Sequence, residues 1–421
     1  MLPGFYWFNL ESSLMDQDTK TNAMLSQGTR LMTQPEMLEK GRQASQLLIG
    51  LPRETSFSEK RITLVPDAVR LLTDTGHGVM IENGAGKEAG FTDHHYAEAG
   101  AQIVYSRDEV YKAELVLKVA PPTNAEIALL RPRQVIISSL NISVLERDFF
   151  VKVSARKATA LAFEYIHDSS GSIPLVRAMS EIAGNAAIYI ATRYLIERDN
   201  QVGVMLGGFS GIPPTEVVIL GAGTVGEYAA RAALGMGAQV KIFDNSLYKL
   251  RRIQTSLQNR VFTSIIDPRV LRKVLETADV VIGAVHATEG RTPCFISEEM
   301  VRGMTEGAVI IDLSIDHGGC VETSAITTHE QPVFRKHGVV HYCVPNIPSM
   351  VSQTASQALS NFFCPLLLQI GDAGGMENLL RQDDDLRKGV YLFNGSATNR
   401  FIADYYELPF QDIGLLMAAF R

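Results

Sequence analysis

A cluster of glycines follows the apolar run VVIL near the middle of the chain, and its spacing suits phosphate binding. Gly221, Gly223 and Gly226 form the pattern G-x-G-x-x-G between a predicted β-strand and a predicted alanine-rich helix. In such a unit the first glycine permits a tight turn, the second lets phosphates approach the backbone, and the third brings the helix close to the strand. The helix N-terminus adds free N–H groups and the positive end of its dipole. This stretch therefore predicts a dinucleotide-binding turn.

An acidic residue ends the next predicted strand, QVKIFD, at the distance that such a unit requires. Asp244 is placed to accept hydrogen bonds from the adenosine ribose hydroxyls, and its charge repels a 2′-phosphate. We therefore predict NAD rather than NADP as the cofactor, with Thr224 and Val225 of the turn in the same site. The alternative is that the three glycines serve only the turn between strand and helix.

A lysine stands inside the apolar stretch ELVLKVAPPTN, from Glu114 to Asn124. This run reads as a buried strand that Pro121 and Pro122 end. A buried ammonium is costly unless something pairs with it. Two explanations for Lys118 remain open: a structural ion pair with a nearby acid, or an ammonium that points into a substrate cleft.

The elements that must position these residues alternate between strands and helices. Apolar runs from QLLIGL onward alternate with segments of helical period, which predicts parallel sheets covered by helices on both faces. Residues 174–200 predict one long helix, a second alternating block runs to about residue 345, and residues 351–372 predict another long helix. The end of the chain predicts helices and loops, and residues 1–45 predict a polar extension that is partly helical.

The bulk composition excludes several classes of protein. The 421 residues carry a formal net charge of −7, which argues against a nucleic-acid partner. Four widely spaced cysteines predict neither disulfides nor a metal site and suit a reducing cytoplasm. No apolar run approaches the roughly 18 residues of a membrane helix, and the N-terminus lacks the pattern of a signal peptide. We expect a cytoplasmic protein without membrane or metal.

Beyond these patterns, the chain resembles the alanine dehydrogenase and transhydrogenase α-subunit family over about residues 48–372. The resemblance rests on the blocks IGLPRETSFSEKRITLVPDAV, GAGKEAGFTDHHYAEAGAQIV, MSEIAG, GVMLGGFSGIPP, VVILGAGTVGEYAARAALGMGA, ADVVIGAV, IDLSIDHGGCVETS and HGVVHYCVPNIPS. It implies reversible NAD-dependent deamination of L-alanine to pyruvate by a homo-hexamer. It also implies two Rossmann-like, doubly wound parallel-sheet domains: a substrate domain at 46–173 and 350–421, and an NAD-binding domain inserted at 174–349.

The same resemblance implies roles for individual residues. Arg61, in EKRITL, matches the arginine that holds the substrate carboxylate, which suits a guanidinium fork. Asp316, in SIDHGG, matches an aspartate beside nicotinamide and substrate, where it could accept a proton if burial raises its pKa. The structural alternatives are a surface arginine and a capping aspartate. Further matches to cofactor contacts are Ser180, Asp244, Lys249, Val285, Asn346 and Ile347.

Two positions depart from the family pattern. Ala120 stands where the family has a substrate-binding lysine, and Asn141 stands where it has an acid–base histidine. Residues i and i+2 of a strand share a face, so Lys118 could replace the missing ammonium; His167 and His286 offer other acid–base groups. Alternatives to alanine dehydrogenation are an oxidoreductase of the same fold on another amino or oxo acid, as in lysine-pathway dehydrogenases, and an NAD-binding protein without turnover.

Overall fold

The computed structural model describes residues 45–56, 58–140, 145–197, 203–286 and 291–419. The predicted N-terminal extension and Asn141 lie outside these ranges. The described chain forms two sheets, each built mainly from parallel strands.

The first sheet takes strands from both ends of the described chain. Six neighbouring strands are parallel; at one edge β14 runs antiparallel to them, and β15 runs antiparallel to β14. Its order is β15-β14-β6-β5-β4-β1-β2-β3. The strands are β1 (Leu48–Leu51), β2 (Gly78–Glu82), β3 (Gln102–Val104), β4 (Leu115–Leu117), β5 (Val135–Ser138), β6 (Thr159–Ala162), β14 (Val390–Phe393) and β15 (Ser396–Ala397).

The second sheet repeats this strand order with the middle of the chain. Its order is β12-β13-β11-β10-β7-β8-β9, in which only β12 runs antiparallel to its neighbour. In both sheets the strand order reverses beside the first strand, between β1 and β4 and between β7 and β10, where doubly wound folds bind ligands. The strands are β7 (Glu216–Leu220), β8 (Gln239–Phe243), β9 (Phe262–Ser264), β10 (Val280–Gly283), β11 (Val309–Asp312), β12 (Val333–Lys336) and β13 (Val339–Tyr342).

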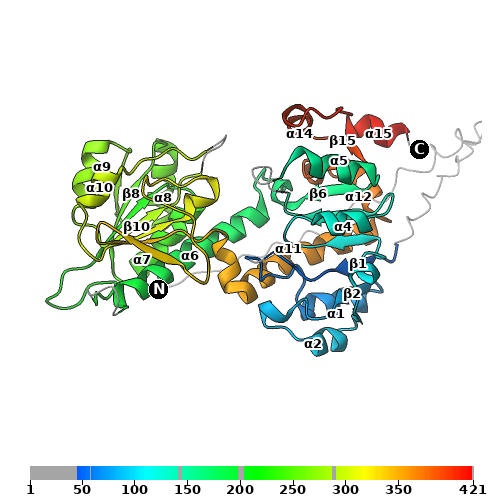
Figure 1. Ribbon diagram of the computed structural model, residues 1–421, viewed down its shortest axis with the longest axis horizontal. Coiled ribbons are helices and arrows are strands. Elements are labelled where there is room, and N and C mark those ends of the chain that lie inside the picture. The colour runs from blue at the N-terminus through cyan, green and yellow to red at the C-terminus, as the bar shows by residue number, and fades with distance from the viewer. Residues whose placement is uncertain (1–44, 57, 141–144, 198–202, 287–290, 420–421) are drawn as a thin grey trace, which may run out of the picture. The chain divides into compact units, whose positions relative to one another are not determined.

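Helices cover both faces of each sheet (Figure 1). In β7, Val217 and Ile219 pack toward α6, α7 and α8, while Val218 and Leu220 pack toward α9 and α10. This explains why the buried strands read as continuous apolar runs. The helices are α1 (Pro66–Asp74), α2 (Asp93–Glu98), α3 (Arg107–Val110), α4 (Asn124–Leu129), α5 (Arg147–Ala155), α6 (Pro174–Ile196), α7 (Thr224–Gly235), α8 (Leu247–Leu257), α9 (Pro268–Leu275), α10 (Glu298–Arg302), α11 (Ser352–Asp372), α12 (Met376–Gln382), α13 (Asp384–Arg387), α14 (Arg400–Tyr405) and α15 (Ile413–Ala419).

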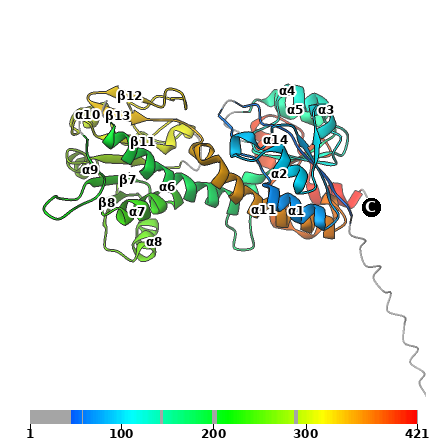
Figure 2. The same cartoon turned by 90° about the horizontal axis from the view of Figure 1, so that it is seen from below.

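Two long helices link the sheets, as Figure 2 shows. Helix α6 packs along α7, and α11 packs against both α1 and α6. Gly184 lies on α6 at its closest approach to α7, where an added Cβ would overlap the Val225 carbonyl oxygen. The missing side chain at Gly184 therefore sets how closely α6 lies to the start of α7.

The predicted α/β class with two mostly parallel sheets is confirmed, and two local predictions are wrong. The C-terminal segment contains β14 and β15 as well as helices, because β14 extends the first sheet by pairing with β6. Strand β4 ends at Leu117, and the chain bends through Val119 and Ala120. Lys118 and Ala120 therefore do not share a strand face. The domain boundaries stay a prediction.

The close approach of α6 and α7 can be tested with Gly184→Ala. We expect it to lower the free energy of unfolding by about 1–3 kcal/mol, because the backbone of α7 must move to admit the methyl group. Thermal unfolding measures the change, and NADH titration reports whether the start of α7 has moved. Gly235→Ala is the matched control, since a Cβ there meets nothing within 4 Å. Equal melting temperatures for the two variants would contradict this view of the helix contact.

Candidate functional site

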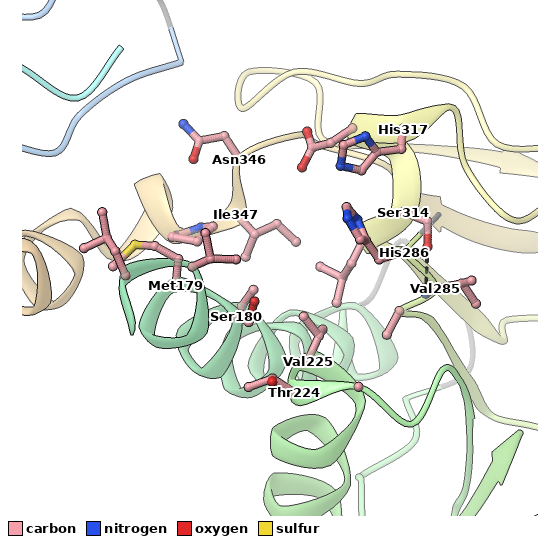
Figure 3. Close-up of a pocket in the computed structure, with 18 of the residues that line it drawn as sticks. Met179, Ser180, Thr224, Val225, Val285, His286, Ser314, His317, Asn346 and Ile347 are labelled. Carbon is pink, nitrogen blue, oxygen red and sulfur yellow. Dashed lines mark hydrogen bonds between the residues drawn. The ribbon is translucent and has the colours of Figure 1, made fainter. Parts of the chain in front are cut away.

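A cavity of about 440 Å³ opens at the carboxyl edge of the second sheet (Figure 3). The segments that follow β7, β10, β11 and β13 form one wall, and one face of α6 forms another. Arg61 and Phe163 reach it from segments of the first sheet. The lining residues are Arg61, Phe163, Leu175, Val176, Met179, Ser180, Ala183, Gly223, Thr224, Val225, Ala284, Val285, His286, Leu313, Ser314, Asp316, His317, Val344, Asn346, Ile347 and Pro348.

The glycine turn has the geometry that a pyrophosphate requires. Gly221 adopts a φ of +105°, which favours glycine, and an added Cβ would overlap the Ala284 carbonyl oxygen. A Cβ at Gly226 would overlap the Gly221 carbonyl oxygen. Gly223 is the N-cap of α7, makes no side-chain cap, and has open space where its Cβ would lie. A phosphate can therefore approach the helix N-terminus without meeting a side chain.

The predicted ribose-binding acid lies beside this turn. The Asp244 carboxylate accepts hydrogen bonds from the backbone N–H of Ala222, at 2.8 Å, and of Ser246, at 2.7 Å. Each carboxylate oxygen keeps a further lone pair for a ligand hydroxyl. Lys249 follows on α8 and is exposed. Four predicted cofactor residues do not line the cavity itself: Gly221, Gly226, Asp244 and Lys249.

Arg61 lines the cavity with part of its guanidinium already paired. Its Nε and Nη2 donate to the two carboxylate oxygens of Glu59, at 2.7 and 2.6 Å, and its Nη1 lies 3.4 Å from the sulfur of Met179. The Asn346 amide donates to the same glutamate at 3.1 Å. Glu59 thus fixes the arginine and leaves Nη1 as the edge that a carboxylate ligand can meet without displacing Glu59.

Asp316 faces the same cavity from a 3₁₀ helix, Leu313–His317. Asp316 is exposed as a residue, although protein atoms surround its carboxylate closely enough to shift its pKa. Burial raises the pKa of Asp316, and the Asn346 backbone N–H and the charge of Arg61 act in the opposite direction. The Asp316 carboxylate therefore binds a proton at a higher pH than the carboxylate of an aspartate in water does.

The turn that carries Asp316 is fixed by a buried neighbour. The Asp312 carboxylate accepts hydrogen bonds from the backbone N–H of Ser314 and Cys320, both at 3.0 Å, and from the Ser324 hydroxyl at 2.7 Å. Ser314 in turn accepts from the backbone N–H of Val285 at 3.0 Å. The segments after β10 and β11 are therefore tied together at the cavity wall.

Two histidines complete the polar lining. His286 was considered from the sequence, whereas His317 was missed although it directly follows Asp316. Their ring centroids lie 4.7 Å apart with an interplanar angle of 75°. The signal in the sequence was weak, because only the pairing of β10 with β11 brings the two segments together.

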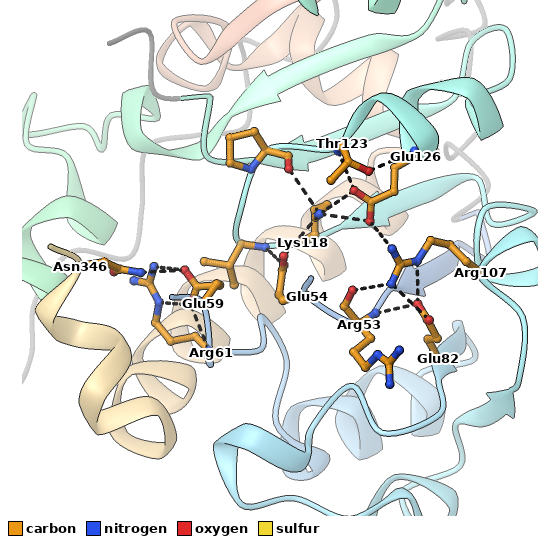
Figure 4. Close-up of polar contacts among 12 residues, drawn as sticks. Arg53, Glu54, Glu59, Arg61, Glu82, Arg107, Lys118, Thr123, Glu126 and Asn346 are labelled. Carbon is orange, nitrogen blue, oxygen red and sulfur yellow. Dashed lines mark hydrogen bonds and ion pairs between the residues drawn. The ribbon is translucent and has the colours of Figure 1, made fainter. Parts of the chain in front are cut away.

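Lys118 lies away from this cavity in a cluster of buried charges (Figure 4). Its ammonium is 3.1 Å from Glu126 and 3.4 Å from Glu54, and its side chain is 1% exposed. Arg107 reaches Glu126 at 3.2 Å and Glu82 at 3.1 Å. This geometry matches the structural alternative for Lys118, an ion pair that offsets the cost of burying the ammonium.

Ala120, at the position of the family lysine, and His167, weighed as an acid–base group, also lie outside the cavity lining. Ala120 is half-buried beyond the bend that follows Lys118. The His167 ring contacts the Tyr165 carbonyl oxygen at 2.8 Å.

The described residues contain no group of three or more His, Cys, Asp or Glu side chains arranged to hold a metal ion. Across the same ranges, no helix is long and apolar enough to cross a membrane.

Two doubly wound sheets and a glycine turn at the cavity define a dinucleotide-binding oxidoreductase fold. Comparison with family models is more specific: residues 50–183 match the N-terminal domain of alanine dehydrogenase/PNT, and residues 187–400 match its C-terminal domain. The chain belongs to the alanine dehydrogenase/PNT family, whose oxidoreductases use NAD or NADP.

Individual relatives cover most of the chain. An alanine dehydrogenase of Methanococcus maripaludis is 37% identical over 86% of this chain and 98% of its own length, and one of Mycolicibacterium smegmatis is 35% identical over 88% and 100%. A solved L-alanine dehydrogenase superposes with a TM-score of 0.81 at 37% identity, covering 86% of this chain and 99% of that one. A transhydrogenase of Sinorhizobium meliloti, with a TM-score of 0.72 at 19% identity over 84% and 99%, shares the fold.

The charge cluster predicts a pH dependence of stability. Burial raises the pKa of Glu54 from 4.5 to about 7, although Lys118 and the Val119 N–H act in the opposite direction. Between these two values the folded protein keeps a proton that the unfolded chain releases, so the free energy of unfolding falls as pH rises through the window. Glu54→Gln removes the titrating carboxyl group and with it this fall in the free energy of unfolding. We expect wild type to lose about 2–3 kcal/mol relative to the variant between pH 4.5 and 8.

Urea unfolding at a series of pH values measures this difference. Burial also raises the pKa of Glu164 to about 7, so Glu164 contributes equally to the pH dependence of unfolding in wild type and in Glu54→Gln. Glu98→Gln, on the exposed side of α2, is the control for loss of a carboxylate. Parallel pH profiles for wild type and Glu54→Gln would rule out a buried, protonated Glu54.

Proposed function

We propose that this protein is an NAD-dependent amino-acid dehydrogenase that converts L-alanine to pyruvate and ammonium, reversibly. The observation that carries the proposal is that Arg61, Asp316 and the N-terminus of α7 meet at one cavity. Such a cavity can hold a small acid next to a dinucleotide. The relatives named alanine dehydrogenase support the choice of substrate.

Arg61 would hold the substrate carboxylate through its Nη1 edge, with Glu59 keeping the guanidinium in place. Ser180, Val225, Val285, Asn346 and Ile347 would form the walls against which the cofactor lies. Asp244 and Lys249 would hold the adenosine end beyond the glycine turn. Asp316 would accept a hydrogen bond from the substrate amine and favour its reacting orientation. Bound NAD supplies the acceptor for the hydride that leaves the α-carbon.

Apolar lining residues would shield the reacting carbon from water once substrate and cofactor fill the cavity. Met179, Phe163, Leu175 and Val176 line the cavity beside Arg61. Removal of water strengthens the attraction between the guanidinium and a carboxylate, since the local dielectric falls. The proposal therefore assigns binding to Arg61 and exclusion of water to the face of α6. By the family resemblance alone, we also propose a cytoplasmic homo-hexamer.

A second candidate is an oxidoreductase of the same fold that acts on a different amino or oxo acid. The observation that favours it is Ala120, a small, half-buried residue where the family pattern has a substrate-binding lysine. Loss of a cation there would change the charge that the site can neutralise on a substrate. A lysine-pathway reaction, which joins an amine to an oxo acid, belongs to this candidate.

The two candidates separate in an NADH absorbance assay. We expect turnover with pyruvate plus ammonium that exceeds turnover with larger oxo acids, because the cavity of about 440 Å³ must hold the nicotinamide as well. Primary amines replace ammonium in a second series. Activity confined to a larger oxo acid or a larger amine would favour the second candidate. Silence across the panel, with NADH still raising the melting temperature, would leave an NAD-binding protein without turnover.

Cofactor choice gives a separate prediction for Asp244. We expect Asp244→Ala to weaken NAD binding and to lower the preference for NAD over NADP at least about 10-fold, the effect of about 1.4 kcal/mol. Asp244→Asn keeps the shape and removes the charge, so it isolates repulsion of the 2′-phosphate. Asp67→Asn, exposed on α1, is the control. Titrations with both reduced cofactors measure the ratio; an unchanged ratio in both Asp244 variants would refute the ribose-binding role.

A further inference from the structure

We propose, on the basis of the proposed dehydrogenase function, that His286 and His317 form an imidazole pair that accepts and returns the protons of the reaction. Both histidines line the cavity, and Figure 3 shows their rings close together at the wall opposite α6 and α7. No role for either ring follows from the glycine turn or from the carboxylate-binding arginine.

The sheet itself brings the two rings together. Strands β10 and β11 are parallel neighbours with Gly283 opposite Asp312, and the histidines follow these two residues within a few positions. The buried Asp312 fixes the 3₁₀ helix that ends at His317. The edge-to-face contact, with centroids 4.7 Å apart, is thus held by backbone on both sides.

Among the described residues that line the cavity, only these imidazoles are suited to cycle protons near neutral pH. The other titratable lining groups are Arg61 and Asp316. A guanidinium does not release its proton in proteins. Burial raises the pKa of Asp316 above that of an ordinary aspartate, about 3.9, which lies well below neutral pH, and the Asn346 N–H and the charge of Arg61 act against this rise. Imidazole changes charge between about pH 5 and 8, which suits it to both halves of an acid–base cycle.

The surroundings keep the pair available as a base. Burial lowers the pKa of both rings, and the pKa of His286 is lowered further by His317 and by Lys249 on α8. The other charged groups around the pair are Asp316 on the same turn, Arg61 across the cavity and Arg291, whose Nη2 lies 3.3 Å from the Gly318 carbonyl oxygen. Because one imidazolium opposes a second beside it, the pair holds at most one proton near neutral pH.

In the direction of deamination, a neutral imidazole would take one N–H proton of the substrate ammonium, and the freed lone pair would form the C=N bond as the α-carbon hydride leaves for the acceptor that bound NAD supplies. The pair would pass this proton to solvent and return to its neutral form. Water would then add to the imine carbon, forming the C–O bond and giving one proton to the pair, which returns it to the nitrogen. The C–N bond would break with its electrons on nitrogen, ammonia would leave, and the hydroxyl proton would pass to the neutral pair and on to solvent as the carbonyl forms.

The decisive experiment compares His286→Gln and His317→Gln with wild type and with His94→Gln, an exposed histidine on α2. We expect each cavity substitution to lower kcat at least about 100-fold, the lower range for loss of an acid–base group. NADH affinity, measured by fluorescence titration, should change little. His317→Gly should regain turnover when free imidazole is added.

A readout that does not depend on turnover is the titration of the histidine Cε1 protons by NMR. In wild type both rings should titrate below the usual range, and in His317→Gln the remaining His286 ring should titrate at higher pH, since its like-charged neighbour is gone. Loss of NADH affinity equal to the loss of kcat would overturn the proposal, because the rings would then position the cofactor. Full activity in both variants would also overturn it.

These outcomes are distinct from failure of the proposed function. Wild-type silence across the substrate panel overturns the proposed function, and this inference with it. An active wild type with active cavity variants overturns only the inference. Imidazole rescue that works equally in His94→Gly and His317→Gly would show a solvent effect and count against the pair.

Discussion

The close approach of backbone at the start of α7 is the constraint on which the cavity depends. Helix α7 lies against β7 at Gly226, against α6 at Gly184, and turns from the strand at Gly221, and at each point a Cβ would meet a carbonyl oxygen. Because these three glycines have no side chains, the backbone can approach closely enough to direct the N-terminus of α7 toward the cavity. The same packing places Met179 and Ser180, on one face of α6, in the lining of the cavity.

The second organising feature is the separation of two polar sites within one chain. In the charge cluster around Lys118, Glu54 and Glu126 pair with the ammonium, Arg107 pairs with Glu126 and Glu82, and the ammonium is shielded from water. Such a cluster stabilises one arrangement of the segments that follow β1, β2 and β4, since breaking a buried pair costs about 3–5 kcal/mol. Arg61, in contrast, is paired on one edge only and presents the other to the cavity. A half-satisfied guanidinium at a cavity wall is suited to binding, whereas a fully enclosed lysine is suited to structure.

Features that depend on residues close together in the sequence could be predicted, whereas contacts between distant segments could not. The glycine turn and Asp244 lie within one strand–helix–strand unit, so their types and spacing were enough to predict the class of ligand and the second sheet. The partner of Lys118 lies eight residues away, at Glu126, but its recognition needed the bend after Leu117, which an apolar run does not reveal. Strand β14 was missed because it pairs with β6, more than 200 residues earlier. The contact of His286 with His317 depends on two strands being neighbours, and nothing in either segment alone carries that information.

The charged and titratable side chains that line the cavity differ in chemistry, so each is suited to a different task. Arg61 keeps its charge at every accessible pH, which suits it to hold a carboxylate, and for the same reason it cannot move a proton. Asp316 is drawn toward the charged form by Arg61 and the Asn346 N–H, and toward the neutral form by burial. A carboxylate under these influences is suited to accept a hydrogen bond from an amine. Burial lowers the pKa of both histidines, and the charge of His317 lowers that of His286 further, so a proton on this pair is readily released. The parallel pairing of β10 with β11 thus places Asp316 and both histidines at one small cavity, and Arg61 reaches it from the segment that follows β1.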